Sequence, residues 1–222
     1  MSLGNSSIDV MATFLSKTYH IPDYQREYSW EAEELEDFWN DLEATRKGLE
    51  ETHFFGQVVV HDDSETKRRY IIDGQQRTTT SMILLRAMQL IYGEIFEMSD
   101  KKMEAAQDQF ADIRSIYLGR QGKRHLTLGG EKDNEYFENS ILSCSPDRTK
   151  NKRKSQEKLR KAYVFFYDRI KELLDKVSDC DAKFELLEEI YHAFIDRFKV
   201  LYMEATKLEE AFVIFETLNA RG

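Results

Sequence analysis

The sequence predicts an α+β fold in which a small mixed sheet is joined to a larger, predominantly helical lobe. Two β-rich runs, at 54–61 and 69–73, flank a charged segment in the manner of a hairpin. Several longer stretches repeat apolar residues at i, i+3, i+4 and i+7, which is typical of amphipathic helices. A chain of 222 residues with 41% hydrophobic content can bury a full core, so we expect one core with the helical lobe attached.

The first part of the chain predicts two helices separated by an irregular segment. Residues 6–16 have helical spacing, and Pro22 ends any regular element that follows them. A second helix is expected after Trp30, with Ser29 as its N-cap. The inward positions of this second helix stand among many carboxylates: Leu35, Phe38, Trp39 and Leu42.

The hairpin has a charged tip at 62–67, and its second strand leads directly into a helix that begins near Gln75. We expect this helix to be buried along most of its length, because apolar side chains recur on its inward positions: Ile83, Leu84, Met88, Ile91 and Ile95. A buried helix of this kind would hold the strand–helix junction rigidly.

The rest of the chain is predicted to be mainly helical. We expect helices at 101–117, after a strand at 124–129, after a polar, basic loop at 145–158, and at 182–198, then a strand at 199–206 and a final helix. This order divides the chain into three parts: a core at 1–98, a helical lobe at 99–197, and a strand and helix at 198–222 that return to the core.

Composition limits the classes of function. The formal net charge of −9 argues against a surface that grips DNA non-specifically over the whole domain, although local basic patches remain compatible with it. Cys144 and Cys180 are far apart and form neither a disulfide framework nor a zinc-ribbon pattern. No apolar run approaches the roughly 18 residues of a membrane span, and no signal-peptide layout is visible. We expect a soluble, cytoplasmic protein, and a fragment of a longer chain.

The most informative stretch is 70–80, where a short apolar strand breaks at Asp73–Gly74 and turns into the long helix. A helix start exposes unpaired N–H groups and about half a positive charge, and phosphate is its usual guest. Gly74 permits a sharp turn, and Asp73 is suited to orient Arg77 or to hold a hydrated metal ion. Further donors follow: Arg77, Thr78, Thr79 and Thr80. An ordinary helix start capped by Asp73 explains the same local pattern.

Two other segments, 21–30 and 215–222, concentrate residue types that core formation does not require. In the first segment, Gln25 and Arg26 follow a turn fixed by proline, from which a guanidinium can reach a phosphate or pair with a nearby carboxylate. Its aromatic residues offer stacking faces or ordinary packing surfaces: Tyr24, Tyr28 and Trp30. The second segment is also compatible with a simple helix C-cap.

Four motifs together carry a resemblance to a known family. They are Ile-Pro-x-Tyr-Gln-Arg-x-Tyr-x-Trp at 21–30, Phe-Gly-Gln at 55–57, Asp-Gly-Gln-Gln-Arg at 73–77, and Phe215 followed by Leu-Asn-x-Arg-Gly at 218–222. In this order they resemble the N-terminal domain of GmrSD-type restriction endonucleases, from about residue 8 to the end. Thr78 stands where that family usually has leucine, which changes packing at the helix start and leaves the loop chemistry intact.

The resemblance implies a ParB/sulfiredoxin-like core and a nucleotide-binding, NTP-hydrolysing sensor domain of a modification-dependent, type IV anti-phage restriction system. In that family a separate C-terminal HNH domain cuts DNA, and no such histidine–metal motif is visible here, so this chain is not expected to cut DNA by itself. The nucleotide site carried over from the family comprises Tyr24, Gln25, Arg26, Asp73, Gly74, Gln75, Gln76, Arg77, Thr78, Thr79, Asn219, Arg221 and Gly222.

The expected mechanism is slow hydrolysis of a nucleoside triphosphate whose base the sequence leaves open. The helix start and Arg77 hold the phosphates, Asp73 binds Mg²⁺, and Gln75 or Gln76 orients the attacking water. A glutamine is a poor base, so turnover should be regulatory rather than metabolic. The expected partners are the nucleotide, DNA through the full-length protein, and the HNH domain. The sequence leaves open whether two copies of the chain form a homodimer.

Two alternatives use other residues. A ParB-like DNA clamp without useful hydrolysis would contact DNA through the basic run Arg148, Lys150, Lys152, Arg153 and Lys154. A metal-dependent nuclease within the domain would use Asp73, Glu27 or the pair Asp62–Asp63, although carboxylates at a hairpin tip are usually a hydrophilic turn. Sulfiredoxin-like phosphoryl chemistry needs a cysteine in the phosphate loop, where this chain has Gln75 and Gln76.

Overall fold

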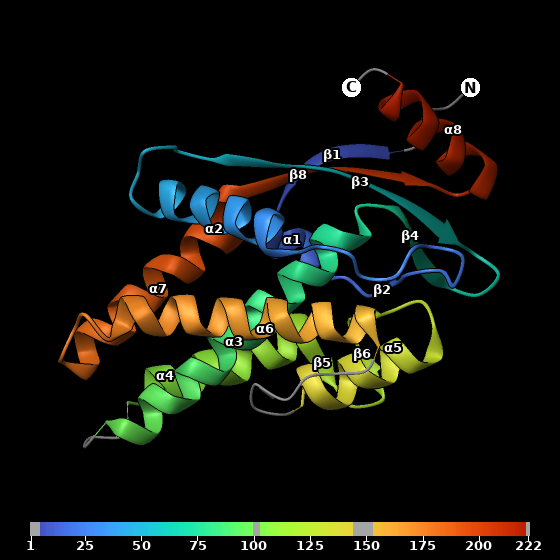
Figure 1. The fold of residues 1–222 in the computed structure, drawn as a ribbon. Coiled ribbons are helices and arrows are strands. Elements are labelled where there is room, and N and C mark those ends of the chain that lie inside the picture. The colour runs from blue at the N-terminus through green and yellow to red at the C-terminus, as the bar shows by residue number, and fades with distance from the viewer. Residues whose placement is uncertain (1–4, 100–102, 144–152, 221–222) are drawn as a thin grey trace.

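A mixed sheet runs through the computed structural model, which describes residues 5–99, 103–143 and 153–220 (Figure 1). Within these residues, six strands are ordered β1-β8-β3-β4-β2-β7. The strands are β1 Asn5–Val10, β2 Tyr19–His20, β3 His53–Asp63, β4 Arg68–Asp73, β7 Leu126–Thr127 and β8 Phe198–Ala205. The three long strands lie side by side, with β3 parallel to β8 and antiparallel to β4. The predicted α+β class is confirmed.

The two faces of the sheet pack against different helices. Val58 and Val60 of β3 belong to the large core that the sheet shares with the helical lobe. Val59, which points to the opposite face, joins Ile72 in a smaller cluster beneath helix α8 (Leu208–Asn219). Accordingly, α8 lies on one side of the sheet and the lobe on the other (Figure 1).

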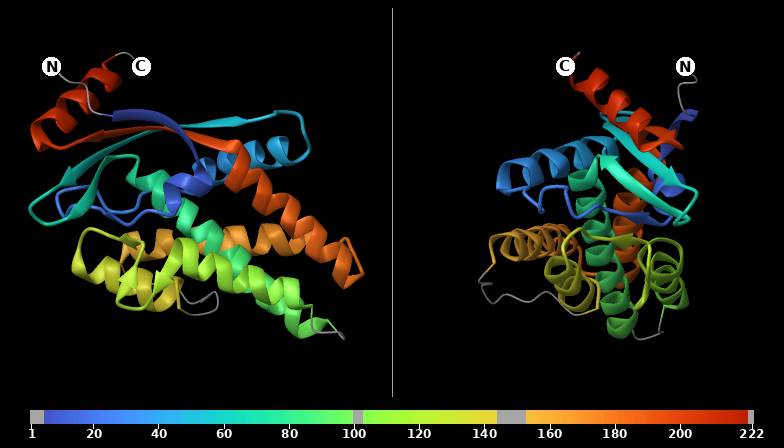
Figure 2. Two further views of the ribbon diagram at one scale, coloured as in Figure 1. Left: turned by 180° about the vertical axis from the view of Figure 1, so that it is seen from behind. Right: turned by 90° about the vertical axis from the view of Figure 1, so that its right-hand side faces the viewer.

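Helix α3 (Gln75–Met98) connects the sheet to the lobe. It leaves the end of β4, and Figure 2 shows it passing from the sheet into the helices below. The predicted inward positions are confirmed, since Ile83, Leu84, Met88, Ile91 and Ile95 are all at most 1% exposed. In the lobe, α3 packs against α4 (Glu104–Asp112), α6 (Lys154–Leu174) and α7 (Cys180–Arg197).

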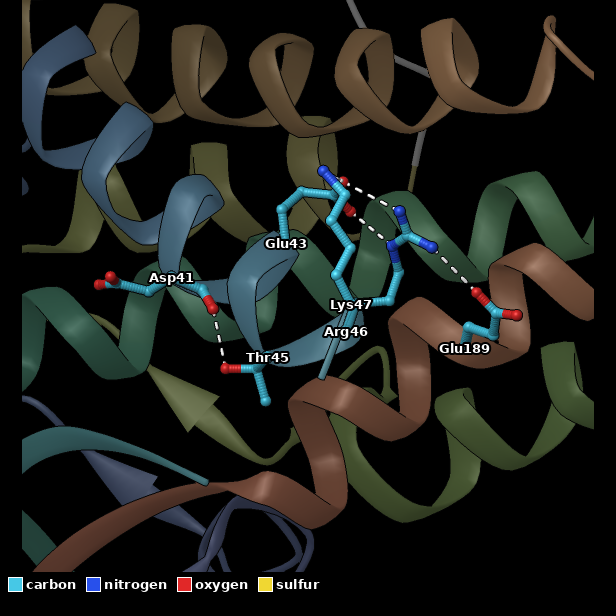
Figure 3. A network of polar contacts seen from close by, with 6 residues as sticks. All are labelled: Asp41, Glu43, Thr45, Arg46, Lys47 and Glu189. Atoms are coloured by element: carbon cyan, nitrogen blue, oxygen red, sulfur yellow. Dashed lines mark hydrogen bonds and ion pairs between the residues drawn. The ribbon is translucent and has the colours of Figure 1, made fainter. Parts of the chain in front are cut away.

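Helix α2 (Ala32–Arg46) is fastened to α7 by a network of charged side chains (Figure 3). Arg46 donates to both carboxylate oxygens of Glu43, and its Nη1 donates to Glu189 of α7 over 2.9 Å. Burial raises the pKa of Glu43, but hydrogen bonds from Arg46 and Lys47 outweigh it, so the pKa is lowered overall. The network therefore holds Glu43 ionised at the end of α2.

Several predicted element boundaries near the N-terminus and in the lobe are wrong. Residues 5–10 form β1, which pairs with β8, and only Met11–Leu15 are helical, as α1. Ile8 and Val10 fit the two-residue period of a strand as well as a helical spacing. The segment forms a strand because it pairs with the edge of β8. Helix α2 is capped by Glu31 in a capping box with Glu34, not by Ser29.

In the lobe, the helix predicted at 101–117 begins at Glu104 within the described residues and changes to a π-helical segment, η1 (Ile113–Leu118). The strand predicted at 124–129 is split into β6 (Lys123–Arg124) and β7. Further elements accompany it: β5 (Gly119–Arg120), α5 (Glu131–Tyr136) and the π-helical segment η2 (Phe137–Ile141). No helix in the described ranges is both long enough and apolar enough to cross a lipid bilayer.

The basic loop predicted at 145–158 is partly helical, because α6 begins at Lys154. The rest of that stretch, up to residue 152, lies outside the described residues. The hairpin of β3 and β4, helix α7, strand β8 and helix α8 confirm their predictions.

Gly74 should be essential to the packing of α3 on the sheet. Its φ is +94°, and a Cβ there would lie 2.9 Å from Val58 Cγ2 and 3.2 Å from the Gln57 carbonyl oxygen. We expect Gly74→Ala to lower the free energy of unfolding by about 3 kcal/mol, measured by urea denaturation. Gly48 is the matched control, since its φ is +72° and nothing lies within 4 Å of its Cβ position. Gly48→Ala should cost about 1 kcal/mol, and equal costs would contradict the contact with β3.

Candidate functional site

The start of α3 is a helix terminus without a side-chain cap. Gly74 occupies the N-cap position in a left-handed conformation, there is no side-chain cap hydrogen bond, and the first turn contains no acidic residue. The Thr78 N–H donates to the Gly74 carbonyl over 3.0 Å, so the N–H groups of Gln75, Gln76 and Arg77 precede the helical ladder. Asp73 ends β4 and is not a cap. The positive end of the helix dipole is therefore uncompensated by a neighbouring capping side chain.

Arg77 fixes this helix start to strand β3. Its Nη2 donates to the Gln57 carbonyl over 2.6 Å and lies 3.8 Å from Asp73 Oδ2. Gly56, with φ +110°, gives the guanidinium its space, because a Cβ there would lie 3.2 Å from Arg77 Cζ. Burial lowers the pKa of Arg77, and the Asp73 carboxylate opposes that shift. The Phe-Gly-Gln motif at 55–57 thus provides the contacts of Arg77, the last residue of the 73–77 motif.

The 21–30 segment is hydrogen-bonded to the junction of β4 and α3 at 72–80, called the corner below, through four side chains. Gln25 Nε2 donates to the Ile72 carbonyl over 2.9 Å. Gln76 acts as a clamp, because its Nε2 donates to the Glu27 carbonyl over 3.1 Å and its Oε1 accepts from the Ser29 N–H over 2.8 Å. The hydroxyls of Tyr28 and Thr80 are hydrogen-bonded at 2.8 Å. Three motifs far apart in the sequence therefore form one structural unit.

A cavity of about 20 Å³ lies between this segment, the first turn of α3 and the lobe. Such a volume has room for about one water molecule. Its polar lining residues are Gln25, Arg26, Glu27, Gln75, Gln76, Thr79 and Asp133. Arg26 is exposed, and Gln75 is half-buried. Arg153 bridges two of the lining carboxylates, with Nη2 at 3.2 Å from Glu27 Oε1 and Nε at 3.2 Å from Asp133 Oδ1.

The comparison with protein families decides the family of the chain. The family model described as GmrSD restriction endonuclease, N-terminal domain, matches residues 10–222. The chain belongs to this family. No curated protein matches the chain. The family match supports a role for this domain in a restriction endonuclease system.

Within this GmrSD domain, the structure separates the predicted phosphate-loop residues into two groups. Gln75, Gln76 and Thr79 line the cavity, but Arg77 does not. Two residues correspond to about 200° around a helix, so Arg77 points toward β3 while Gln75 points into the cavity. Gln76 is 6% exposed and hydrogen-bonded to the backbone of 27–29, so Gln75 is the better placed of the two glutamines to orient a water. The buried bonds of Gln76 use the polar atoms that the water would need.

The hydroxyls of Thr78, Thr79 and Thr80 all have hydrogen-bond partners within the protein. Thr78 is fully buried and donates to the Gly74 carbonyl over 2.9 Å, and Thr79 donates to the Gln75 carbonyl over 2.8 Å. Thr80 is bonded to Tyr28, as described above. Helical threonines often bond to the carbonyl four residues earlier, so these hydroxyls satisfy the helix rather than offer donors to a ligand.

Of the aromatic residues in 21–30, only Tyr24 is strongly exposed, at 61%. Its ring centroid lies 6.2 Å from that of Phe212 on α8. Tyr28 is 7% exposed, and Trp30 packs edge-on against Phe38 and Phe55, so both belong to the core. Asn219 ends α8, whereas Arg221 and Gly222 lie outside the described residues.

The residues predicted to hold a metal or to contact DNA lie in different surroundings. The described residues contain no group of three or more His, Cys, Asp or Glu side chains that could hold a metal. The Asp63 carboxylate accepts from Glu65 and Thr66 and so organises the hairpin turn. Arg153 is occupied by ion pairs, while Lys154 is exposed at the start of α6. The other predicted DNA contacts, Arg148, Lys150 and Lys152, lie outside the described residues.

Sequence reasoning missed the contribution of the lobe to this cavity. Asp133 of α5, Leu159 of α6 and Leu128–Gly129 line it, although they lie far from the motifs in the sequence. Only Gly129 gives a local signal, because a Cβ there would lie 2.6 Å from the Pro22 carbonyl oxygen. The close approach explains why the chain uses glycine where the lobe meets the 21–30 segment.

The Gln76 clamp gives a direct test. Gln76→Ala would leave the buried backbone groups of Glu27 and Ser29 without their partner, so we expect a loss of about 1–3 kcal/mol in the free energy of unfolding. Hydrogen exchange of the Ser29 amide should accelerate. Gln75→Ala, one position earlier, should change stability by about 0.5 kcal/mol or less. A Ser29 amide that stays equally protected in Gln76→Ala would refute the clamp.

Proposed function

We propose that this domain binds a nucleoside triphosphate with Mg²⁺ at the start of α3 and hydrolyses it slowly, as the regulatory input of a restriction system. The observation that supports this most strongly is the uncapped helix start beside a cavity that Arg26 also lines. Unpaired amides and a helix dipole favour a phosphate, and an exposed guanidinium adds charge-assisted donors.

Binding requires the cavity to open. At about 20 Å³ it is too small for a phosphate chain. Arg26 and Glu27 are both exposed on its wall, so their side chains can swing outward without disturbing the core. When Glu27 turns away from Arg153, a second guanidinium becomes available to the phosphates. An anionic ligand and the Glu27 carboxylate thus compete for the Arg153 guanidinium.

The remaining roles follow from position. Asp73, at the end of β4 and next to the helix start, supplies one carboxylate to Mg²⁺, which commonly completes its shell with phosphate oxygens and water. Arg77 acts as a positioning residue, since it contacts Asp73 and ties α3 to β3. Tyr24 offers its exposed ring to the base.

Gln75 is the residue best placed to orient the attacking water, because it lines the cavity while Gln76 is used by the backbone. An amide can align water but cannot remove its proton efficiently, so catalysis depends on positioning and charge stabilisation. Slow turnover suits a domain that reports nucleotide state to a nuclease. In this proposal, DNA is cut by an HNH domain and not by the residues of this domain.

Isothermal titration calorimetry of ATP, GTP, CTP and UTP with Mg²⁺ tests nucleotide binding. We expect at least one nucleotide to bind the wild type, and Arg26→Ala to weaken it by about tenfold through loss of a charge-assisted contact. Arg68→Ala removes another exposed arginine, on β4, and should leave affinity within about twofold. Absence of binding by all four nucleotides, or equal binding by Arg26→Ala, would overturn the proposal.

The competition between ligand and Glu27 predicts a gain of affinity. Glu27→Gln removes a negative charge from the cavity wall and frees Arg153 Nη2 of its ion pair, while Arg153 Nε keeps its contact with Asp133. The preferred nucleotide should therefore bind about threefold to tenfold more tightly. Glu65→Gln, at the distant hairpin tip, is the charge-matched control and should have no measurable effect. Unchanged or weaker binding by Glu27→Gln would mean that the phosphates lie elsewhere.

A further inference from the structure

A second concentration of positive charge lies in the helical lobe, away from the motifs. Arg86 of α3, Arg114 of η1 and Arg124 of β6 line one cavity of about 260 Å³. The neutral polar groups of its wall include Gln89, Gln121 and Ser143. Among the residues that the structure describes, this lining carries three guanidinium groups and no carboxylate. Their arrangement therefore creates a positive potential inside a domain whose formal net charge is −9.

Two of these arginines are buried at the cavity wall. Arg86 is 7% exposed and Arg124 is 9% exposed, whereas Arg114 is exposed. Arg124 donates from Nη1 to the Gly119 carbonyl and from Nη2 to Ser143 Oγ, each over 2.8 Å. Both acceptors are neutral, and Nε has no hydrogen-bond partner among the described residues. A buried guanidinium with only neutral acceptors retains a strong attraction for an anion.

Electrostatics within the cluster agree with this geometry. Burial lowers the pKa of Arg124, Glu138 raises it, and the neighbouring Arg114 and Arg86 lower it. Glu138 does not line the cavity, and its carboxylate accepts from Asn134 Nδ2 over 3.0 Å. The guanidiniums are therefore close enough to repel one another, and an anion between them would relieve that repulsion.

The cluster is held by a polar network and an unusual backbone. Arg86 Nη1 donates to Gln89 Oε1 over 2.5 Å, and Gln89, which is 1% exposed, donates to the Phe110 carbonyl over 3.0 Å. Arg114 lies on the π-helical segment η1. The π-helix is rare in proteins overall, but where it occurs it is often at a functional site. Gly119 has φ +69°, and a Cβ there would lie 2.3 Å from the Lys123 carbonyl oxygen, so the turn that positions Arg124 depends on glycine.

We propose that this cavity binds a small phosphate-bearing anion, either free or as the phosphate tail of a nucleotide. Guanidinium forks match phosphate oxygens, and the volume accommodates a phosphate group with several waters. A small ligand fits better than a DNA duplex, because the two buried arginines lie where backbone phosphates of a duplex cannot reach. Gln75 and Arg86 are eleven residues apart on α3, or about 16 Å, so one buried helix joins this site to the corner.

Calorimetric titration with pyrophosphate, inorganic phosphate and ATP tests the site in the Arg26→Ala background, which weakens the corner. We expect pyrophosphate to bind, Arg114→Ala to weaken it by about tenfold, and Arg120→Ala to leave it within about twofold. Arg120 is the matched control because it is exposed on the adjoining β5 and does not line the cavity. Tighter binding of ATP than of pyrophosphate identifies the nucleotide as the source of the phosphate.

The second variant is Arg124→Gln, and circular dichroism checks that the variant folds. We expect this substitution to abolish pyrophosphate binding. If this variant unfolds, Arg114→Glu replaces it, with the same expected loss of binding. The proposal is overturned if neither phosphate nor pyrophosphate binds at millimolar concentration, or if the arginine substitutions leave binding unchanged. It is also overturned if a 12-bp DNA duplex binds through Arg114 while the small anions do not. A negative result at this cavity would not overturn the proposed nucleotide site at the start of α3. Nucleotide binding there is tested separately, by comparing the wild type with Arg26→Ala.

Discussion

The junction of β4 and α3 is the constraint on which the rest of the site depends. Gly74 reverses the backbone in a left-handed conformation that brings it against Val58 and Gln57 of β3. This contact fixes the direction of α3, and Arg77 secures it by its bond to the Gln57 carbonyl. The uncapped amides therefore have a fixed orientation. Helix starts gain function when their amides are preorganised in this way, because no reorganisation is needed when charge arrives.

The corner is also the meeting point of the sheet and the lobe. Gln76 holds the 27–29 backbone over the helix start, while Arg153 at the head of α6 pairs with Glu27 and Asp133. A ligand that displaced Glu27 would thus alter a contact between the 21–30 segment and α6. Such an exchange of one anion for another is a local electrostatic event of the kind that switches use. It offers a physical route from nucleotide state to the arrangement of the lobe.

The sequence predicted the α+β class, the hairpin, and the long buried helix, because each depends on a strong local periodicity or turn signal. Residues 6–10, predicted as the start of a helix, form part of β1 because their pairing with β8 is a contact across the whole chain. The motifs also predicted that the 21–30 segment meets the 73–77 segment. They could not show that Arg77 faces β3 or that Gln76 is a clamp, since a side chain's direction around a helix start depends on what packs there. The contribution of Asp133 and Arg153 has no local signal at all.

The central claim is that the first-turn amides of α3 contact a triphosphate. Two-dimensional ¹⁵N–¹H NMR during titration with the preferred nucleotide and Mg²⁺ tests it most directly, because each amide is observed separately. We expect the largest chemical-shift changes at the amides of Gln75, Gln76 and Arg77. At low ligand concentration, the amides of the Arg114–Arg124 region should change less. Saturation of binding with the three first-turn amides unmoved would contradict it.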